Sequence, residues 1–569
     1  MTTKTASKDR LWSRREIEGL IAEGRKIIIL DGRVIKADAW LPFHPGGDKT
    51  ILHMVGRDGT DEIRALHSPE AQAEMQKFVI GRIQGRWVNF LPPIQGGHFR
   101  PYARGQDDNE AEEEEEEEEE EGDSDLQTDG AFSSCSDSTA PPSPIFDPVD
   151  VRDRGTSSPS TSSLSENEQT DINSDPIQMK LAAEKSSDIL KYPSLDYSSQ
   201  SRIVAKYREV DAQIRAAGLY NCPYGAYGVE CCRYILLFAS SLLALHYSYY
   251  ALSGALLGLF WHQLVFTAHD AGHMGITHNF HVDTCIGILI ADFLGGLSIG
   301  WWKRNHNVHH IVTNSPEHDP DIEHMPFFAI STRFFSSLRS TYYDRIMQFD
   351  SIARLAIAKQ HWLYYPILLL GRFNLYRLSW EYLFLGQAPK KGPAWWHRYL
   401  EILGQFVFWW WFGYGIVYRC IPTAWDRFVF VMVSHMVTAP LHVQITLSHF
   451  AMSTTDMGVH ESFPQKMLRT TMDVDCAPWL DFVHGGLQFQ AIHHLYPRIP
   501  RHNLRKAQVY VREFCKETGV PYAIYGFTRG NKEVLGRLEE VARQVRVFEE
   551  CRKVCAREVV GEREHAHSH

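Results

Sequence analysis

The sequence predicts an α-helical polytopic membrane protein, with about four transmembrane helices plus interfacial helices, preceded by a small mixed N-terminal unit. Three observations lead to this fold class: long apolar runs in the second half, tight histidine clusters beside them, and an acidic, apolar-poor stretch between two different halves. With 569 residues the chain is too long for one compact domain, so two or more units are expected.

Composition divides the chain into four parts. Residues 10–95 form a mixed, globular-looking unit with turn signals at Leu30–Arg33 and Pro45–Gly47. Residues 96–195 are rich in Glu, Ser, Asp and Pro and too poor in apolar residues to offset their ordering entropy, which predicts a disordered linker. Residues 200–540 form the membrane unit, and residues 541–569 are predicted to be a charged tail without a functional role.

Charge says little about the substrate. The net charge is −11, and the acidity belongs to one tract, Glu110 with Glu112–Glu121. The chain has neither a basic stripe nor a recognised nucleic-acid-binding motif, so nucleic acid is not an expected partner. The ten cysteines imply no disulfide framework. The first twenty residues lack the apolar core of a signal peptide, so we expect the N-terminal unit to stay in the cytosol.

Apolar run length predicts the spans, because a helix needs about 20 apolar residues to cross a ~30 Å hydrocarbon layer. Tyr234–Ala268 is long enough for a helical hairpin, and Tyr399–Ile421 with Phe428–Leu447 can form a second. Two further runs are ambiguous. Trp362–Leu385 carries three charged residues and is expected at the interface.

Orientation follows from the positive residues between the hairpins, which place that stretch in the cytosol. With two spanning hairpins, both termini and all three histidine clusters lie on the cytosolic side. This requires Cys285–Trp302 to be re-entrant or interfacial, because a single crossing there would separate the first two clusters.

Three histidine clusters have helical ligand spacing and adjoin apolar runs. They consist of His269 and His273, then His306, His309 and His310, then Gln490, His493 and His494. Seven imidazoles exceed the four ligands of one zinc ion, so two transition-metal ions are expected, and the nitrogen-rich ligand set favours iron. The zinc-protease HExxH motif is absent. The competing interpretation, three unrelated groups of interfacial histidines, requires a coincidence.

The N-terminal unit resembles the cytochrome b5 family through "HPGG" at His44–Gly47 and the histidine of "LHSPEA", His67. The resemblance covers about residues 10–95 and implies a small α+β fold that binds haem b, with His44 and His67 as axial ligands. Two imidazoles leave no open position on the iron, so the unit would transfer electrons. His53 has no motif support and is expected at the surface or beside a ligand.

The membrane unit resembles the membrane fatty-acyl desaturases and hydroxylases over roughly residues 225–510. The resemblance implies a di-iron centre of two iron ions, with O₂ as co-substrate. The fused haem unit and the "QxxHH" form of the third cluster resemble the front-end desaturases. That family has a further histidine ligand at the end of the fourth membrane helix, which corresponds to His449 in "LSHF".

Several polar residues near the clusters have open roles. Asp270, Asn307, Asp319 and Asp321 either orient ligand imidazoles or act as caps and turn residues. His442, seven residues before His449 on the same face but deeper, is expected beside the ligands or lining the site. The histidines off the cluster spacing, His278, His281, His318 and His324, are expected beside the ligands or at the surface. Gln490 stands at the offset that His306 has in the second cluster, so we expect it to contact a metal directly or through one water.

The first cluster with its extension "HDAGHMGITHNFHVD", the chain length and the acidic insert resemble the fungal sphingolipid Δ8 (long-chain base) desaturases. The resemblance implies a sphingolipid long-chain base or ceramide as lipid substrate, an NADH-dependent cytochrome b5 reductase as electron donor, and the endoplasmic reticulum membrane as location. Two alternatives remain: a Δ5/Δ6 acyl-lipid desaturase or lipid hydroxylase on the same scaffold, and a membrane-anchored haem protein that only transfers electrons.

Overall fold

The N-terminal unit is built on a small sheet with helices beside it. The computed structural model describes residues 8–102 and 176–566, and it describes side-chain surroundings as far as residue 554. The sheet has the order β1-β4-β3-β2, with β1 parallel to β4 and the other neighbours antiparallel. Its strands are β1 (Leu11–Trp12), β2 (Ile27–Leu30), β3 (Arg33–Lys36) and β4 (Val79–Ile83). The helices of the unit are α1 (Arg14–Ala22), α2 (Asp48–Leu52), α3 (Thr60–Leu66) and α4 (Pro69–Met75). The predicted small α+β unit is confirmed.

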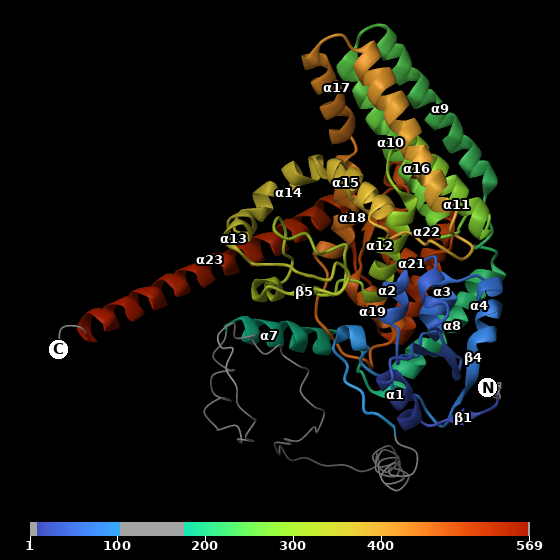
Figure 1. The fold of residues 1–569 in the computed structure, drawn as a ribbon, viewed down its shortest axis with the longest axis vertical. Helices are drawn as coiled ribbons and strands as arrows, with labels where there is room; N and C mark the ends of the chain where they lie inside the picture. Colours follow the sequence, from blue (N-terminus) through green and yellow to red (C-terminus); the bar gives the residue numbers. More distant parts are fainter. Residues whose placement is uncertain (1–7, 103–175, 567–569) are drawn as a thin grey trace.

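A bundle of long apolar helices forms the membrane unit (Figure 1). Within the described residues, three helices are long and apolar enough to cross a bilayer: Tyr224–His246 (α9), Tyr250–Gly272 (α10) and Ala424–Phe450. The last comprises α17 (Ala424–Met436) and α18 (Ala439–Phe450). The apolar run predicted to begin the second hairpin is α16 (His397–Phe408) followed directly by a π-helical segment, η6 (Trp409–Cys420). The predicted helical membrane fold is confirmed.

A sharply bent helix pair occupies the ambiguous run at Cys285–Trp302. The segment Phe280–Leu294 (α11 and η4) and the helix Ile299–Val312 (α12) meet at 118°. The bend allows the chain to enter the bundle and return on the same side, as the prediction of a re-entrant segment requires. Helices α13 (Ser351–Ile357), α14 (Gln360–Leu369) and α15 (Gly371–Phe384) follow, and they expose large apolar side chains such as Trp362 and Leu385.

The remaining helices pack below the bundle, next to the N-terminal unit (Figure 1). Tyr207 of α8, Met467 of α19 and Leu504 of α22 share one buried core with the helix α21. Their bounds are α8 (Tyr197–Ala216), α19 (Phe463–Thr470), α21 (Gln490–Leu495) and α22 (Arg501–Thr518). A long C-terminal helix, α23 (Phe527–Ala566), projects away from the body.

The predicted linker is too long at its C-terminal end. Residues 103–175 lie outside the described residues, but Pro176–Lys191 forms the helix α7. Its polar side chains are tied to other segments, since Glu184 accepts from Arg537 Nη1 at 2.8 Å and Lys180 pairs with Glu540. At the other end, Arg100 pairs with Glu18 of α1 at 3.1 Å, so the N-terminal unit extends past residue 95. Composition could not reveal these partners, which lie 82 residues away for Arg100 and more than 350 residues away for the side chains of α7.

The predicted boundary at residue 540 is also wrong. Helix α23 continues through it, and Val541 and Val545 are buried against Phe334 and Ile357. The buried face recurs every four residues among many charges, so the segment belongs to the membrane unit at least as far as Val545.

Candidate functional site

The first histidine cluster lies at the C-terminal end of α10. His269 is in its last turn and His273 is its C-cap. Between them, Asp270 accepts from the hydroxyl of Tyr227 at 2.5 Å and from the Arg501 guanidinium, which also pairs with Glu230. Asp270 therefore anchors the end of α10 to α9 and α22.

The second cluster lies on α12, whose N-terminus is capped by Ser298. Asp319 fixes the ring of His309, because its two carboxylate oxygens lie 2.9 and 3.0 Å from Nδ1. This contact places the proton on Nδ1 and leaves Nε2 free to bind a metal. Asp321 approaches His306 more loosely, at 3.6 Å. The orienting role left open by the sequence therefore holds for Asp319.

The third cluster lies on α21, and all of its side chains are buried. The helix is held by Asp473, which accepts from the backbone N–H of Ala491 at 2.7 Å. Burial and the neighbouring imidazoles hold the pKa values of His493 and His494 well below the usual range, so both rings are neutral near pH 7. Neutral rings keep the lone pair that a metal requires.

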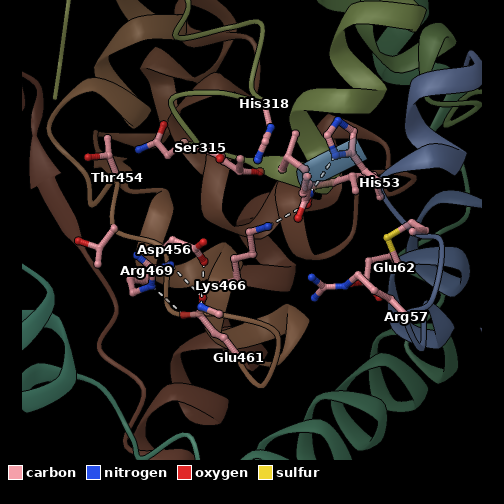
Figure 2. Close-up of a pocket in the computed structure, with 18 residues that line it drawn as sticks. His53, Arg57, Glu62, Ser315, His318, Thr454, Asp456, Glu461, Lys466 and Arg469 are labelled. Carbon is pink, nitrogen blue, oxygen red and sulfur yellow. Dashed lines mark hydrogen bonds and ion pairs between the residues drawn. The ribbon is translucent and has the colours of Figure 1, made fainter. Parts of the chain in front are cut away.

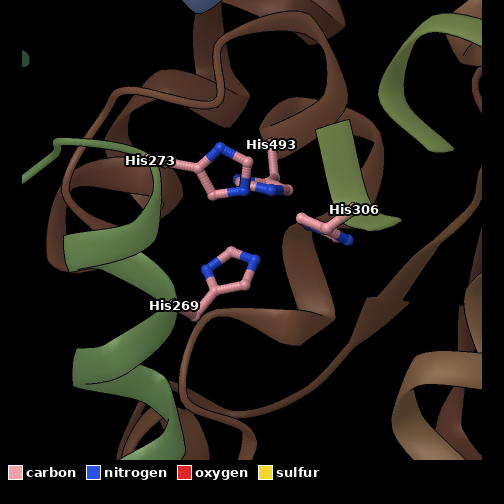
Figure 3. Close-up of side chains that lie close together, drawn as sticks. All are labelled: His269, His273, His306 and His493. Atoms are coloured by element: carbon pink, nitrogen blue, oxygen red, sulfur yellow. The ribbon is translucent and has the colours of Figure 1, made fainter. Parts of the chain in front are cut away.

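The clusters meet in one place. His269, His273, His306 and His493 offer ligand nitrogens that all lie within 4.8 Å of one another (Figure 3). His309, His449 and His494 form a second such group. His449 of α18, proposed from resemblance alone, thus lies beside one histidine of the second cluster and one of the third, His309 and His494.

His310 lies between the two groups. Its ring centroid is 4.9 Å from that of His273 and 4.3 Å from that of His494. Its Nε2 is 3.1 Å from His306 Nε2, and the Nε2 atoms of His309 and His494 are 3.2 Å apart. Two nitrogens bound at right angles to one ion, at ~2.1 Å each, are about 3 Å apart. The spacing therefore suits two adjacent metal ions.

Unpartnered buried atoms show that the residues fit such ions. Buried polar groups normally have hydrogen-bond partners. Here several buried ring nitrogens and one amide oxygen have no partner among the described residues. They are His269 Nε2, His273 Nε2, His310 Nδ1, His449 Nδ1, His493 Nε2 and Gln490 Oε1. Metal ions would use ring lone pairs that are otherwise costly to bury.

Gln490 begins α21 and is 4% exposed. Its amide oxygen lacks a partner although the side chain is buried. The oxygen is therefore available to a metal ion or to its bound water.

The two histidines of the N-terminal unit face each other across a cavity of about 730 Å³. The ring centroids of His44 and His67 are 5.8 Å apart. Each donates Nδ1–H to a backbone carbonyl, His44 to Gly47 at 2.9 Å and His67 to Ile63 at 3.1 Å. Burial, followed by the neighbouring His44, lowers the pKa of His67 to about 3, so its ring is neutral. The pair fits the two axial positions of a haem.

Close packing against the His44 ring and a left-handed backbone conformation explain the two glycines of this site, Gly46 and Gly47. A Cβ on Gly46 would lie 2.9 Å from the His44 ring, and Gly47 has φ +87°. A side chain at either position would displace the ligand or strain the turn.

The other histidines have local roles. His442 donates to the Leu368 carbonyl at 2.9 Å, and His278 bonds the carbonyls of Met274 and Tyr220. His53 is 1% exposed and bonds Gln95, so it is not a surface residue. His281 lies 3.2 Å from His397, His318 faces His53, and His324 packs near Phe450.

Sequence patterns missed Trp302, whose ring stacks on His306 at 4.4 Å and contacts His269 and His273 at 5.2 and 5.4 Å. It closes one side of the metal centre. Because Trp302 lies four residues before His306 on α12, helical spacing could have predicted that the two rings are neighbours.

The fold and these sites define a membrane protein with buried histidine clusters that could hold metal ions, joined to a unit whose two facing histidines fit a haem. Family models agree. Residues 246–526 match fatty acid desaturases, and residues 13–84 match the cytochrome b5-like haem/steroid binding domain.

Individual relatives extend the match to nearly the whole chain. A "Delta 8-(E)-sphingolipid desaturase" of Emericella nidulans is 61% identical, over 98% of this chain and 99% of the relative. A protein of the same name from Candida albicans is 46% identical over 95% and 97%. An "Acyl-lipid (9-3)-desaturase" of Borago officinalis is 37% identical over 62% and 78%. The chain therefore belongs to the fatty acid desaturase family, in a form fused to a cytochrome b5-like domain.

Proposed function

We propose that this protein is a Δ8-desaturase of the sphingolipid long-chain base, acting on ceramide or a related sphingolipid to give an E double bond. The observation that carries the proposal is 61% identity to a Delta 8-(E)-sphingolipid desaturase over almost the full length of both chains. Both sites described above lie within that alignment. The plant acyl-lipid relative matches at 37% over 62% of this chain, which gives the Δ5/Δ6 acyl-lipid alternative weaker support.

The metal ions are proposed to be two irons, which when bound supply the O₂ activation needed to remove hydrogen from an unactivated CH₂ group. The chain supplies the surroundings. The eight histidines offer ring nitrogens to the metal site, and all but His269 are at most 9% exposed. Asp319 holds His309 in one tautomer and Trp302 covers the rings on one side. This burial excludes bulk water from the reacting carbons.

The haem unit is proposed to deliver electrons from an NADH-dependent cytochrome b5 reductase. His44 and His67 would hold the haem iron between them, and an iron held by two imidazoles would transfer electrons and would not bind O₂. We further propose the endoplasmic reticulum membrane as location, with termini and both sites cytosolic. In Figure 1 the N-terminal unit and the histidine-bearing helices lie at the same end of the bundle, which supports a shared side.

Expression in a host that lacks Δ8-unsaturated bases tests the substrate. We expect a new 8-E double bond in long-chain bases by mass spectrometry and chromatography against E and Z standards, and none with His310→Ala. New double bonds confined to fatty acids would overturn the substrate, and hydroxylated products would overturn the reaction.

A further inference from the structure

Helix α12 separates the two cofactor sites. His306, His309 and His310 belong to the metal centre, whereas Lys303 and Asn307 of the same helix line the cavity between His44 and His67. His273 belongs to both sets, since it lines that cavity and is a member of the first histidine group. The two sites therefore share one wall.

Specific contacts hold the N-terminal unit against this wall. Arg304 of α12 pairs with Asp48 at 3.0 Å, and Lys49 pairs with Asp344 at 2.8 Å. Arg498 donates to the backbone carbonyl of the haem ligand His67 at 3.1 Å. The haem cavity is thus completed by the membrane unit, through Thr277 and Phe280 as well as Lys303.

Lys303 is buried without a counter-ion. It is 7% exposed, and no carboxylate of the described residues lies within 4.0 Å of its ammonium group. The ammonium group lies over the face of Phe280, 5.1 Å from the ring centroid. A buried ammonium group without an anion is costly, so this position indicates an anionic partner.

Nearby carboxylates are already engaged. Asp283 accepts from the backbone of Thr277 at 2.9 Å and from its hydroxyl at 2.6 Å. Glu401 accepts from the Gly300 backbone at 3.0 Å and from Ser298. Neither is close enough to form an ion pair with Lys303.

Charge inside the cavity points the same way. Of the residues that line it, Lys303 is the only lysine or arginine, and the acidic ones are Glu62, Glu70 and Glu74 of the N-terminal unit. Haem carries two carboxylates on one edge, which would be repelled by the glutamates and attracted by the lysine.

We propose that the haem is bound at the contact between the two units, with Lys303 of the membrane unit as the cation for one haem carboxylate. Haem occupancy itself rests on the proposed function. The assignment makes Lys303 a positioning residue: it orients the haem edge towards α12 and the metal centre and ties haem retention to docking of the two units.

Haem loss from the full-length protein tests the assignment independently of desaturation. Haem transfer to apomyoglobin is followed by absorbance. We expect Lys303→Met to lose haem about tenfold faster than the parent, because a charge-assisted hydrogen bond is removed. Lys303→Arg keeps the charge and should lose haem at close to the parental rate. Haem loss from Lys303→Met at the parental rate would overturn the proposal.

A matched control comes from the second pocket between the units (Figure 2). Lys466 is a half-buried lysine there, donates to the Ile311 carbonyl at 3.0 Å and does not line the haem cavity. Lys466→Met should retain haem as the parent does. Equal acceleration in both variants would show that loosened docking is the cause and would overturn the direct contact.

A measurement on the parent protein covers the case in which Lys303→Met fails to fold. Reconstitution of the unsubstituted protein with haem dimethyl ester removes the carboxylate charges of the haem without changing the protein. The ester should be lost about tenfold faster than haem from the parent. Equal retention of haem and its ester by the parent would overturn the proposal even if the protein desaturates sphingolipids.

Discussion

The two cofactor sites of this molecule are built in opposite ways. The N-terminal unit places His44 and His67 on opposite sides of a cavity of about 730 Å³, with ring centroids 5.8 Å apart. The membrane unit brings eight histidines from α10, α12, α18 and α21 into direct ring contact, as in the 4.6 Å between the centroids of His309 and His449. The first arrangement leaves space for a planar group, and the second brings ring nitrogens close enough together to share metal ions. One site takes both of its histidines from a small local fold and is closed by the membrane unit, and the other exists only when four distant helices meet.

Removing the central ring of the metal centre should have the largest effect. His310 lies between the two histidine groups, so His310→Ala removes a contact shared by both. We expect desaturation to fall at least ~100-fold, because a metal ligand that contacts both histidine groups is lost. Metal content should fall with it. Product analysis and metal analysis of the purified protein measure the two effects. An unchanged haem absorbance would show that the sites are built independently, and full metal content would remove His310 from the ligand set.

Loss of a haem ligand should have the opposite pattern, with the haem site impaired and the metal centre intact. His44→Ala leaves His67 as the single axial imidazole, so we expect a changed or lost haem spectrum and no NADH-driven desaturation. The metal content of the membrane unit should equal that of the parent. Full activity in this variant would mean that the fused haem unit is dispensable.

A smaller effect is expected from the carboxylate that orients a ligand. Asp319 is fully buried and lies 2.9 Å from His309 Nδ1. Asp319→Asn keeps the shape but weakens control of the tautomer, and such changes cost about 10–100-fold in metal affinity or activity. Asp321→Asn, at the looser 3.6 Å contact with His306, is the matched comparison and should cost less. Equal losses in both variants would contradict the ranking by distance.

Sequence patterns predicted the locally encoded features. The "HPGG" turn, the histidine spacings and the apolar runs each report on a segment of a few turns. The membrane fold followed from the apolar runs, and the small N-terminal α+β unit followed from the resemblance to the cytochrome b5 family. Contacts between distant segments could not be predicted. The orienting role of Asp319 stayed open because its distance to His309 depends on how the loop after α12 folds back. The linker was drawn too long because the partners of α7, such as Arg537, are far away in sequence. Lys303 showed no pattern, since its environment arises from docking of two units.

Gln490 probes how strictly the metal centre requires nitrogen. Its buried Oε1 has no partner among the described residues. We expect Gln490→His to keep much of the activity and Gln490→Ala to lose about tenfold, because one contact to a metal or its water disappears. Product formation and metal content are measured for both variants. Equal activity of the two would leave Gln490 without a chemical task.

The smallest effect is expected at the ion pair that joins the two sites. Arg304 and Asp48 are 3.0 Å apart, with side chains 18% and 41% exposed, so the pair contributes only ~0–1 kcal/mol. Asp48→Arg should slow oxidation of the reduced haem a few-fold, since like charges then face each other where the units dock. The double variant Asp48→Arg with Arg304→Asp restores an attractive pair and should recover the rate. Stopped-flow absorbance of the haem at two salt concentrations measures this, because added salt should shrink the difference. No recovery in the double variant would mean that docking of the two units depends on the buried contacts and not on this pair. The contact between the units would then be as rigid as the packing of the histidines in the metal centre.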